Sequence, residues 1–186
     1  MRVIAGSAKG HRLQVPVGLN TRPTAARIKE SIFNMIALDL PGCQFLDLFS
    51  GSGSMGIEAI SRGADHAIFV ENNPMAIQSI QRNLQHTKFQ KYATVYQNDV
   101  IETLYVLARQ KQKFDIIFMD PPYNNHNIVL ILNTIKEYDL LNPDGYIIVE
   151  HEVNYSIEDI STFKLWKEKK YKTTTMTFLI LQEAKR

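Results

Sequence analysis

Short apolar segments alternate with segments of helical period through the middle of this 186-residue chain, and that alternation limits the folds that it can adopt. We predict strands at 44–49, 67–70, 93–96, 114–119 and 146–150. Helices are expected after the first four of them, at 54–62, 74–85, 100–109 and 128–138. Strands that alternate with helices favour a mainly parallel sheet that is covered on both faces.

The last part of the chain departs from this alternation. Two β-rich runs, 163–166 and 174–181, have no helical segment between them and predict an antiparallel C-terminal hairpin. The sequence Asn-Pro-Asp-Gly at 142–145 predicts a turn directly before the fifth strand. Together these elements predict an α/β fold with a seven-stranded sheet, in which ligands bind beyond the carboxyl ends of the strands.

Basic residues gather at the amino end of the chain. Residues 1–30 hold six lysine and arginine side chains and one acid, a formal charge of +5, whereas the whole chain carries +2. This asymmetry is typical of an arm that meets phosphate, although a solvated terminal segment would have the same composition. A helix capped by Thr24 and ending near Leu38 follows the arm. We therefore expect residues 1–40 to form a basic arm and helix, and residues 41–186 to form one globular domain.

A second group of basic residues lies in the predicted hairpin. Its members are Lys164, Lys167, Lys169, Lys170 and Lys172. Lysines also keep exposed edge strands soluble, so this composition leaves open whether the group contacts nucleic acid.

A glycine-rich turn joins the first predicted strand to the following helix. Gly51, Gly53 and Gly56 have the G-x-G-x-x-G spacing of dinucleotide-binding folds, in which glycine lets the backbone turn tightly and approach a ligand. The motif alone is weak, because such turns are often purely structural. No Gly-Lys-Ser/Thr sequence accompanies it, which disfavours a loop for nucleoside triphosphates.

Three acidic residues mark the ends of successive predicted strands. Asp47 precedes the glycines, where a carboxylate would repel pyrophosphate but could accept a hydrogen bond from an ammonium group. Glu71 could bind two ribose hydroxyls, and Asp99 could accept from an adenine amino group. Each acid by itself could equally be a turn residue or a helix cap. Together with the glycines, the three favour a pocket for a cationic nucleoside.

The sequence Asp120-Pro121-Pro122-Tyr123 follows the most apolar predicted strand. The prolines fix the backbone and leave the Pro121 carbonyl without a competing N–H at the next residue, so this carbonyl and Asp120 could both accept from one –NH2 group. Tyr123 could stack on the base that carries the amine. Acceptors on its hydrogens would draw the amine's lone pair out of conjugation with the ring and orient it. The pattern therefore predicts methyl transfer to an exocyclic amine of a nucleic-acid base, with positioning worth up to about 7–11 kcal/mol.

The remaining composition is that of a soluble domain. A single cysteine, Cys43, excludes an internal disulfide, and neither a secretory leader nor a membrane-spanning run is evident in the sequence. The five histidines have no metal-ligand spacing. We expect a cytoplasmic monomer that binds no metal and no membrane.

Several motifs distributed along the chain can be compared with known families. They are Arg2-Val3-Ile4-Ala5-Gly6, Lys9-Gly10, Thr21-Arg22-Pro23-Thr24, Arg27-Ile28-Lys29-Glu30, Phe33-Asn34, the loop from Asp47 to Gly56, Glu58-Ala59, Ser61-Arg62-Gly63-Ala64, and Asp120 to Tyr123. In these motifs the chain resembles the RsmD family of methyltransferases over nearly its whole length, and the N-terminal motif is the specific part. Ser50, Ser54 and Met55 stand where the family more often has alanine, alanine and leucine, and Lys172 stands where glycine is common.

The resemblance implies a Rossmann-like class I fold with S-adenosyl-L-methionine as the cofactor. The implied cofactor-binding residues are Asp47, Ser50, Gly51, Gly53, Glu71, Asn72, Asp99 and Val100. Catalysis is implied at Asp120, Pro121, Pro122 and Tyr123, and substrate binding at Arg22, Thr24, Arg27 and Lys29. The implied substrate is the 2-amino group of a guanine in small-subunit (16S) ribosomal RNA, either as free RNA or in an assembling small subunit.

Three other functions remain open on the sequence. A DNA adenine-N6 methyltransferase would use the same Asp-Pro-Pro-Tyr sequence, but a separate target-recognition domain is not evident in 186 residues. A nicotinamide-dependent oxidoreductase would use the glycine motif but would leave Asp-Pro-Pro-Tyr unexplained. A non-catalytic RNA-binding protein would need neither the intact glycines nor Asp120.

Overall fold

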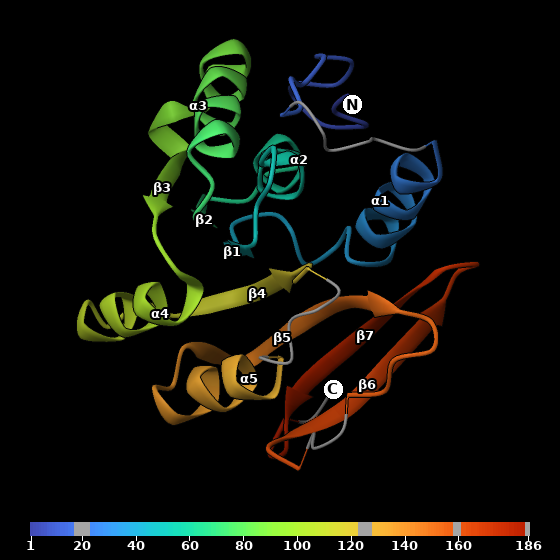
Figure 1. Cartoon of the computed structure of the whole chain (residues 1–186), viewed down its shortest axis with the longest axis vertical. Helices are drawn as coiled ribbons and strands as arrows, with labels where there is room; N and C mark the ends of the chain where they lie inside the picture. Colours follow the sequence, from blue (N-terminus) through green and yellow to red (C-terminus); the bar gives the residue numbers. More distant parts are fainter. Residues whose placement is uncertain (17–22, 123–127, 158–160, 185–186) are drawn as a thin grey trace.

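The strands form one sheet in the computed structural model, which describes residues 1–16, 23–122, 128–157 and 161–184. Across these residues the sheet has seven strands in the order β3-β2-β1-β4-β5-β7-β6 (Figure 1). The strands are β1 (Gln44–Leu48), β2 (His66–Glu71), β3 (Ala93–Gln97), β4 (Phe114–Met119), β5 (Leu141–Glu152), β6 (Phe163–Lys170) and β7 (Thr174–Leu181). Strands β1 to β5 pair in parallel, whereas β7 is antiparallel to both β5 and β6. The predicted fold is confirmed.

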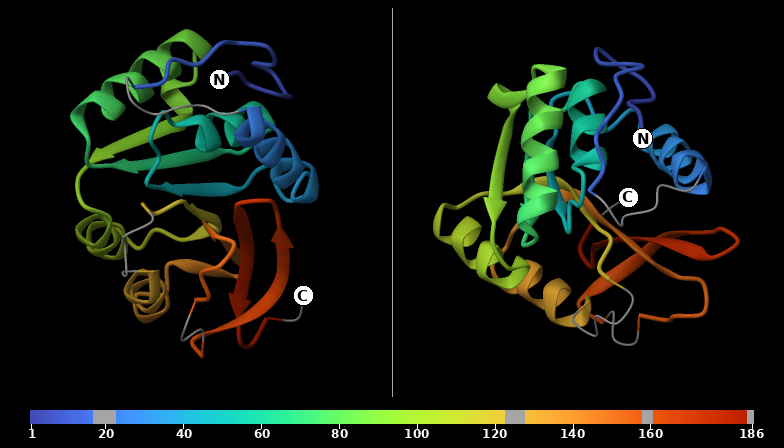
Figure 2. Two further views of the ribbon diagram at one scale, coloured as in Figure 1. Left: turned by 45° about the vertical axis from the view of Figure 1, so that its right-hand side comes forward. Right: turned by 45° about the horizontal axis from the view of Figure 1, so that its top comes forward.

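Helices cover both faces of the sheet because successive strand residues point to opposite sides. Phe45, Phe69 and Ile116 belong to one core cluster, and their neighbours Leu46 and Ile117 belong to the other. Figures 1 and 2 show α2 and α3 on one side of the sheet and α4 and α5 on the other. The helices are α1 (Pro23–Met35), α2 (Ser54–Ser61), α3 (Pro74–Thr87), α4 (Val100–Arg109) and α5 (Ile128–Glu137), with a short 3-10 helix, η1 (Gln90–Tyr92).

Several predicted boundaries are wrong: α1 ends at Met35 and not near Leu38, and β6 extends to Lys170 and not to 166. Residues 142–145 do not form a turn before β5 but its irregular first part, where the pairing with β4 shifts between Phe114 and Ile116. Asp115 stabilises this segment, because its carboxylate accepts a hydrogen bond from Asn142 at 2.7 Å. Helix α1 begins at Pro23, so Thr24 lies in its first turn and is not its cap. Proline suits this position because the first N–H groups of a helix have no partner within it.

The described part of the amino-terminal arm is docked onto α2 through one buried carboxylate. Glu58 is fully buried and accepts hydrogen bonds from the N–H groups of Ile4 at 2.8 Å and Ala5 at 3.0 Å. It also pairs with Lys29 of α1 at 3.0 Å and with Arg62 at 2.9 Å. Burial raises the pKa of Glu58, but the Lys29 charge and these hydrogen bonds outweigh it and hold that pKa below its ordinary value. Glu58 therefore joins the arm, α1 and α2.

The carboxyl ends of the central strands meet at one edge of the sheet. Leu48 at the end of β1 pairs with Val70 of β2 on one side and with Met119 of β4 on the other. The residues that follow these strands are therefore close in space, although they are far apart in the sequence. A search of the described residues for a helix long and apolar enough to cross a membrane finds none.

Candidate active site

The glycine loop lies between β1 and α2 and contains several residues in the left-handed backbone region. Phe49, Gly51 and Gly53 have φ angles of 61°, 55° and 75°. A Cβ added to Gly51 would meet no atom within 4 Å, so the loop borders open space there. A Cβ on Gly56 would lie 2.3 Å from the ring of Phe69, so only glycine lets α2 pack this closely on β2. The loop thus combines a tight turn with close packing of helix and sheet.

Asp47 lies under this loop with its side chain buried. The carboxylate accepts a hydrogen bond from the Gly56 N–H at 3.0 Å, at the start of α2. The pKa of Asp47 is raised to about 7: burial is the main cause, the Gly56 hydrogen bond opposes the rise, and the negative charges of Asp120 and Glu71 add to it. Among the described residues, no ion pair neutralises Asp47. The site therefore favours a positively charged ligand.

Glu71 ends β2 and is hydrogen-bonded to the glycine loop. One carboxylate oxygen accepts from the Gly51 N–H at 2.8 Å, and the other accepts from the N–H groups of Asn72 and Asn73, each at 2.9 Å. The Ser50 hydroxyl donates to the Asp47 carbonyl at 2.6 Å and accepts from the Val70 N–H at 3.0 Å, and its contact with a cofactor stays a prediction. Ser50 therefore ties β1 to β2.

Asp99 follows β3 and caps α4. Its carboxylate accepts from the N–H of Ile101 at 2.8 Å, and Val100 is the first helical residue. Asp99 itself is exposed at this edge. The helix-cap interpretation of Asp99 is therefore correct, and a contact with a nucleoside stays a prediction.

Asp120 and the two prolines follow β4 at the same edge. Asp120 and Pro122 are exposed, whereas Pro121 is buried; Tyr123 lies outside the described residues. Although part of Asp120 reaches solvent, the surrounding protein desolvates its carboxyl and raises the pKa to about 6. The structure places this carboxylate close enough to Asp47 for their charges to interact.

A cavity of 130 Å³ joins the glycine-loop end of α2 to the Asp120 corner. Ser54 and Met55 line it from α2, and Asp120 lines it from the end of β4. Its other walls are mostly apolar and come from α1, the arm and the sheet, with Met1, Ile28, Lys29, Ile32 and Phe118. Ser54 and Met55 of the glycine motif therefore share a cavity with Asp120, whereas Asp47, Gly51 and Glu71 do not line it.

Glu150 also lines this cavity, and the sequence analysis did not identify it as a site residue. Burial, followed by the negative charge of Asp120, raises the pKa of Glu150 to about 8. Its position in the sequence could have indicated it, because Glu150 is an acid near the end of β5, the strand that pairs with β4. No recognisable motif surrounds it.

The predicted substrate-binding residues lie in different environments. Arg27 is exposed on α1, whereas Arg22 and the side chain of Thr24 lie outside the described residues. Lys29 is only 3% exposed and its ammonium group pairs with Glu58, so its charge is not available to a phosphate at the surface. We therefore leave Lys29 out of the residues proposed to bind RNA. Across the described residues, no group of three histidine, cysteine or acidic side chains could hold a metal ion.

Comparison with known proteins gives a consistent set of relatives. The family model described as Conserved hypothetical protein 95 matches residues 1–180. The chain is 47% identical over 152 residues to the Putative rRNA methyltransferase YlbH of Bacillus subtilis (strain 168). These aligned residues cover 82% of this chain and 83% of that protein. It is 31% identical over 170 residues to the Ribosomal RNA small subunit methyltransferase D of Escherichia coli (strain K12). These aligned residues cover 91% of this chain and 84% of that protein. The solved structure of the Putative methyltransferase yhhF from Escherichia coli is similar over 100% of this chain and 99% of that one, with a TM-score of 0.83 and 29% identity.

Proposed function

Because this chain belongs to the RsmD family, we propose that it transfers a methyl group from S-adenosyl-L-methionine to the 2-amino group of a guanine in small-subunit ribosomal RNA. The observation that carries the proposal is the cavity lined by both the start of α2 and Asp120. Such a cavity would bring a donor at the glycine loop next to an amine held at Asp120. The names of the relatives, which are methyltransferases of ribosomal RNA, support RNA as the substrate.

The residues around the glycine loop fit a nucleoside that carries positive charge. Asp47 is a buried acid with a raised pKa and no ion-pair partner among the described residues, so a nearby cation would favour its ionised form. The carboxylates of Glu71 and Asp99 would accept from ribose hydroxyls and an adenine amino group. The open space beside Gly51 leaves room for the ligand backbone. When bound, the cofactor would supply an electrophilic methyl group on a positively charged sulfur.

Asp120 and the Pro121 carbonyl would hold the amine that receives the methyl group. With a pKa of about 6, Asp120 is mostly ionised at neutral pH and can accept a hydrogen bond from the amine. Two acceptors on one –NH2 group would fix the direction of the nitrogen lone pair. The proton that the amine loses would pass to the Asp120 carboxylate and then to water. Glu150, with a pKa of about 8, is mostly protonated at neutral pH. Asp120 and Glu150 together therefore carry about one negative charge and not two.

Methyl transfer from labelled S-adenosyl-L-methionine tests the proposal. The substrates are small subunits and free ribosomal RNA from cells that lack the gene, with DNA as the competing substrate. We expect label in ribosomal RNA or small subunits, at a single guanine that mass spectrometry identifies as N2-methylated. Label in DNA adenine would contradict ribosomal RNA as the substrate. Tight binding of a nicotinamide cofactor would contradict methyl transfer as the reaction.

The Asp120→Ala variant tests the assigned site. We expect it to abolish methyl transfer and to leave cofactor affinity within about threefold of wild type, since Asp120 would bind the amine rather than the cofactor. Asp65→Ala removes an exposed acid at the opposite end of the sheet and serves as the matched control. Full turnover by Asp120→Ala would contradict the role of this residue.

A further inference from the structure

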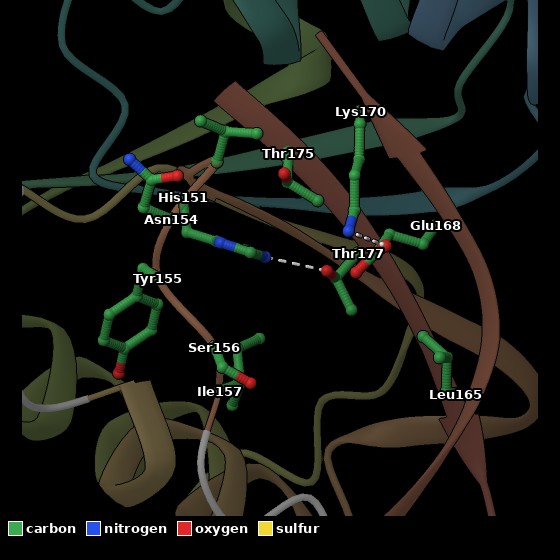
Figure 3. A pocket seen from close by; sticks show the side chains of 11 residues that line it. His151, Asn154, Tyr155, Ser156, Ile157, Leu165, Glu168, Lys170, Thr175 and Thr177 are labelled. Atoms are coloured by element: carbon green, nitrogen blue, oxygen red, sulfur yellow. Dashed lines mark hydrogen bonds and ion pairs between the residues drawn. The ribbon is translucent and has the colours of Figure 1, made fainter. Parts of the chain in front are cut away.

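A second cavity, of 260 Å³, lies on the hairpin beside the carboxyl end of β5 (Figure 3). The segment 153–157 passes over the strands and forms one wall, and β5, β6 and β7 form the others. The polar and aromatic side chains that line it include His151, Asn154, Tyr155, Glu168, Lys170 and Thr175. The cavity lies on the opposite face of the sheet from Glu150, because Glu150 and His151 are consecutive residues of β5.

This second cavity shares lining residues with a small hollow next to the catalytic corner. The hollow is lined by Pro121 and Pro122, which follow Asp120. His151 and Tyr155 line both the hollow and the second cavity. An RNA strand that passes the prolines around the carboxyl edge of the sheet could therefore reach the second cavity.

The walls of the second cavity carry one aromatic ring, one cation and several hydrogen-bonding groups. The Lys170 ammonium pairs with Glu168 at 3.2 Å, and both side chains are exposed enough to exchange this contact for a ligand. The Thr175 hydroxyl is buried and has no hydrogen-bond partner among the described residues. The ring of Tyr155 lies edge-on to His151, with 5.7 Å between the ring centroids. These are the groups that bind a base and its phosphate.

The size of the second cavity and the charge beside it limit which ligands can bind there. Pockets for drug-sized ligands usually measure about 300–1,000 Å³, so 260 Å³ suits a single nucleotide rather than a dinucleotide. Strand β6 is exposed from its second residue to its last, and it carries the basic residues Lys164, Lys167, Lys169 and Lys170. Of these, only Lys170 lines the cavity, because Lys164, Lys167 and Lys169 pair with residues of the other core cluster and so lie on the other face. A phosphate in the cavity would therefore meet Lys170.

We propose that the second cavity binds a nucleotide that flanks the target guanine in RNA, with its base against Tyr155 and its phosphate at Lys170. The inference rests on the proposed RNA substrate. It assigns to the C-terminal hairpin the binding of the RNA nucleotides next to the target guanine. It gives one hairpin lysine, Lys170, a role that the composition of the hairpin left open.

Filter binding of a labelled transcript of small-subunit ribosomal RNA, at several salt concentrations, tests the phosphate contact. Lys170→Ala should weaken binding about threefold to tenfold and reduce the slope of log affinity against log salt by about one. Lys169→Ala is the matched control, because Lys169 pairs with Met176 and points to the other face of the sheet, and it should stay within about twofold of wild type. Glu168→Gln should strengthen binding by up to about fivefold, because it frees Lys170 and removes a negative charge.

Two substitutions of one residue test the base contact. Tyr155→Leu fills a similar space without a ring and should weaken binding about tenfold, whereas Tyr155→Phe keeps the ring and should bind like wild type. Equal effects of the two variants, or equal effects of Lys170→Ala and Lys169→Ala, would overturn the subsite.

Wild-type activity separates failure of the subsite from failure of the proposed function. If wild type methylates the RNA and the Tyr155→Leu and Lys170→Ala variants bind the transcript normally, the subsite alone is overturned. If wild type neither binds nor methylates ribosomal RNA, although calorimetry detects S-adenosylhomocysteine binding, both the RNA substrate and the subsite are overturned.

Discussion

Replacing Asp47 with asparagine should stabilise the ligand-free protein increasingly as pH rises. The pKa of Asp47 lies at about 7 in the folded protein, against an ordinary value of 3.8 that applies to the unfolded chain. Below pH 3.8 the carboxyl is protonated in both states and costs nothing. As pH rises from 3.8 to about 7, the unfolded chain loses this proton first, so the wild-type protein loses stability over that window.

The expected size of this effect follows from the pKa difference. Each pKa unit corresponds to about 1.4 kcal/mol, so between pH 5 and pH 8 the wild type should lose about 2–3 kcal/mol that the variant keeps. In a domain of this length, 1 kcal/mol changes Tm by about 2–4 °C, so the Tm difference between the two proteins should grow by about 4–12 °C. The amide of the Asp47→Asn variant could itself change the free energy of unfolding, but that change is the same at both pH values. It therefore cancels when the Tm differences at pH 5 and pH 8 are compared.

Scanning calorimetry at pH 5 and pH 8, without cofactor, measures the effect. Asp65→Asn, in an exposed position, is the control and should melt like wild type at both pH values. Parallel Tm profiles for wild type and Asp47→Asn would refute the reasoning. If the same carboxylate binds a cationic cofactor, the variant should also bind S-adenosyl-L-methionine about tenfold to a hundredfold more weakly in calorimetric titration.

Three further substitutions test other parts of the structure. Glu58→Gln should lower the free energy of unfolding by about 3–5 kcal/mol, because it leaves a buried Lys29 ammonium unpaired, and adding Lys29→Met should recover part of the loss; an unchanged denaturant midpoint would contradict this. Gly56→Ala should cost about 1–3 kcal/mol in the same assay, because its Cβ would lie 2.3 Å from an aromatic ring; wild-type stability would show that the helix can shift freely. The rate of methyl transfer should rise with pH as Asp120 becomes ionised, at a pH of about 6, and should change again at a pH of about 8, where Glu150 loses its proton. In Glu150→Gln only the lower step should remain, and an unaltered profile would separate Glu150 from the reaction.

The regular elements could be predicted because local sequence determines them. The predicted limits of β4 and α4 agree with the structure, since a strand buried on both faces is continuously apolar and a helix that packs on a sheet has one apolar side. The irregular segment 142–145 could not be predicted, because Asn-Pro-Asp-Gly favours a turn in isolation. A contact with Asp115, from another strand, determines its conformation.

The candidate site was predictable to the extent that its residues lie at strand ends. Asp47, Glu71 and Asp120 were identified because each one ends or directly follows an apolar run, and parallel strands bring such ends together. The role of Lys29 was not predictable, because its partner Glu58 lies 29 residues later on another helix and charge counting cannot reveal the pair. Glu150 has the same strand-end position as the other acids but lacks a motif.

The irregular start of β5 sets the alignment of everything downstream on that strand. Because side chains alternate with a period of two, deleting one residue within 142–145 so that pairing slips by one would move His151 into the place of Glu150 and Glu152 into the place of His151. An imidazole would then face Asp120 across the first cavity, and a carboxylate would stand where the hairpin now offers an imidazole ring. The spacing of four inconspicuous residues thus determines which chemistry each side of the sheet presents.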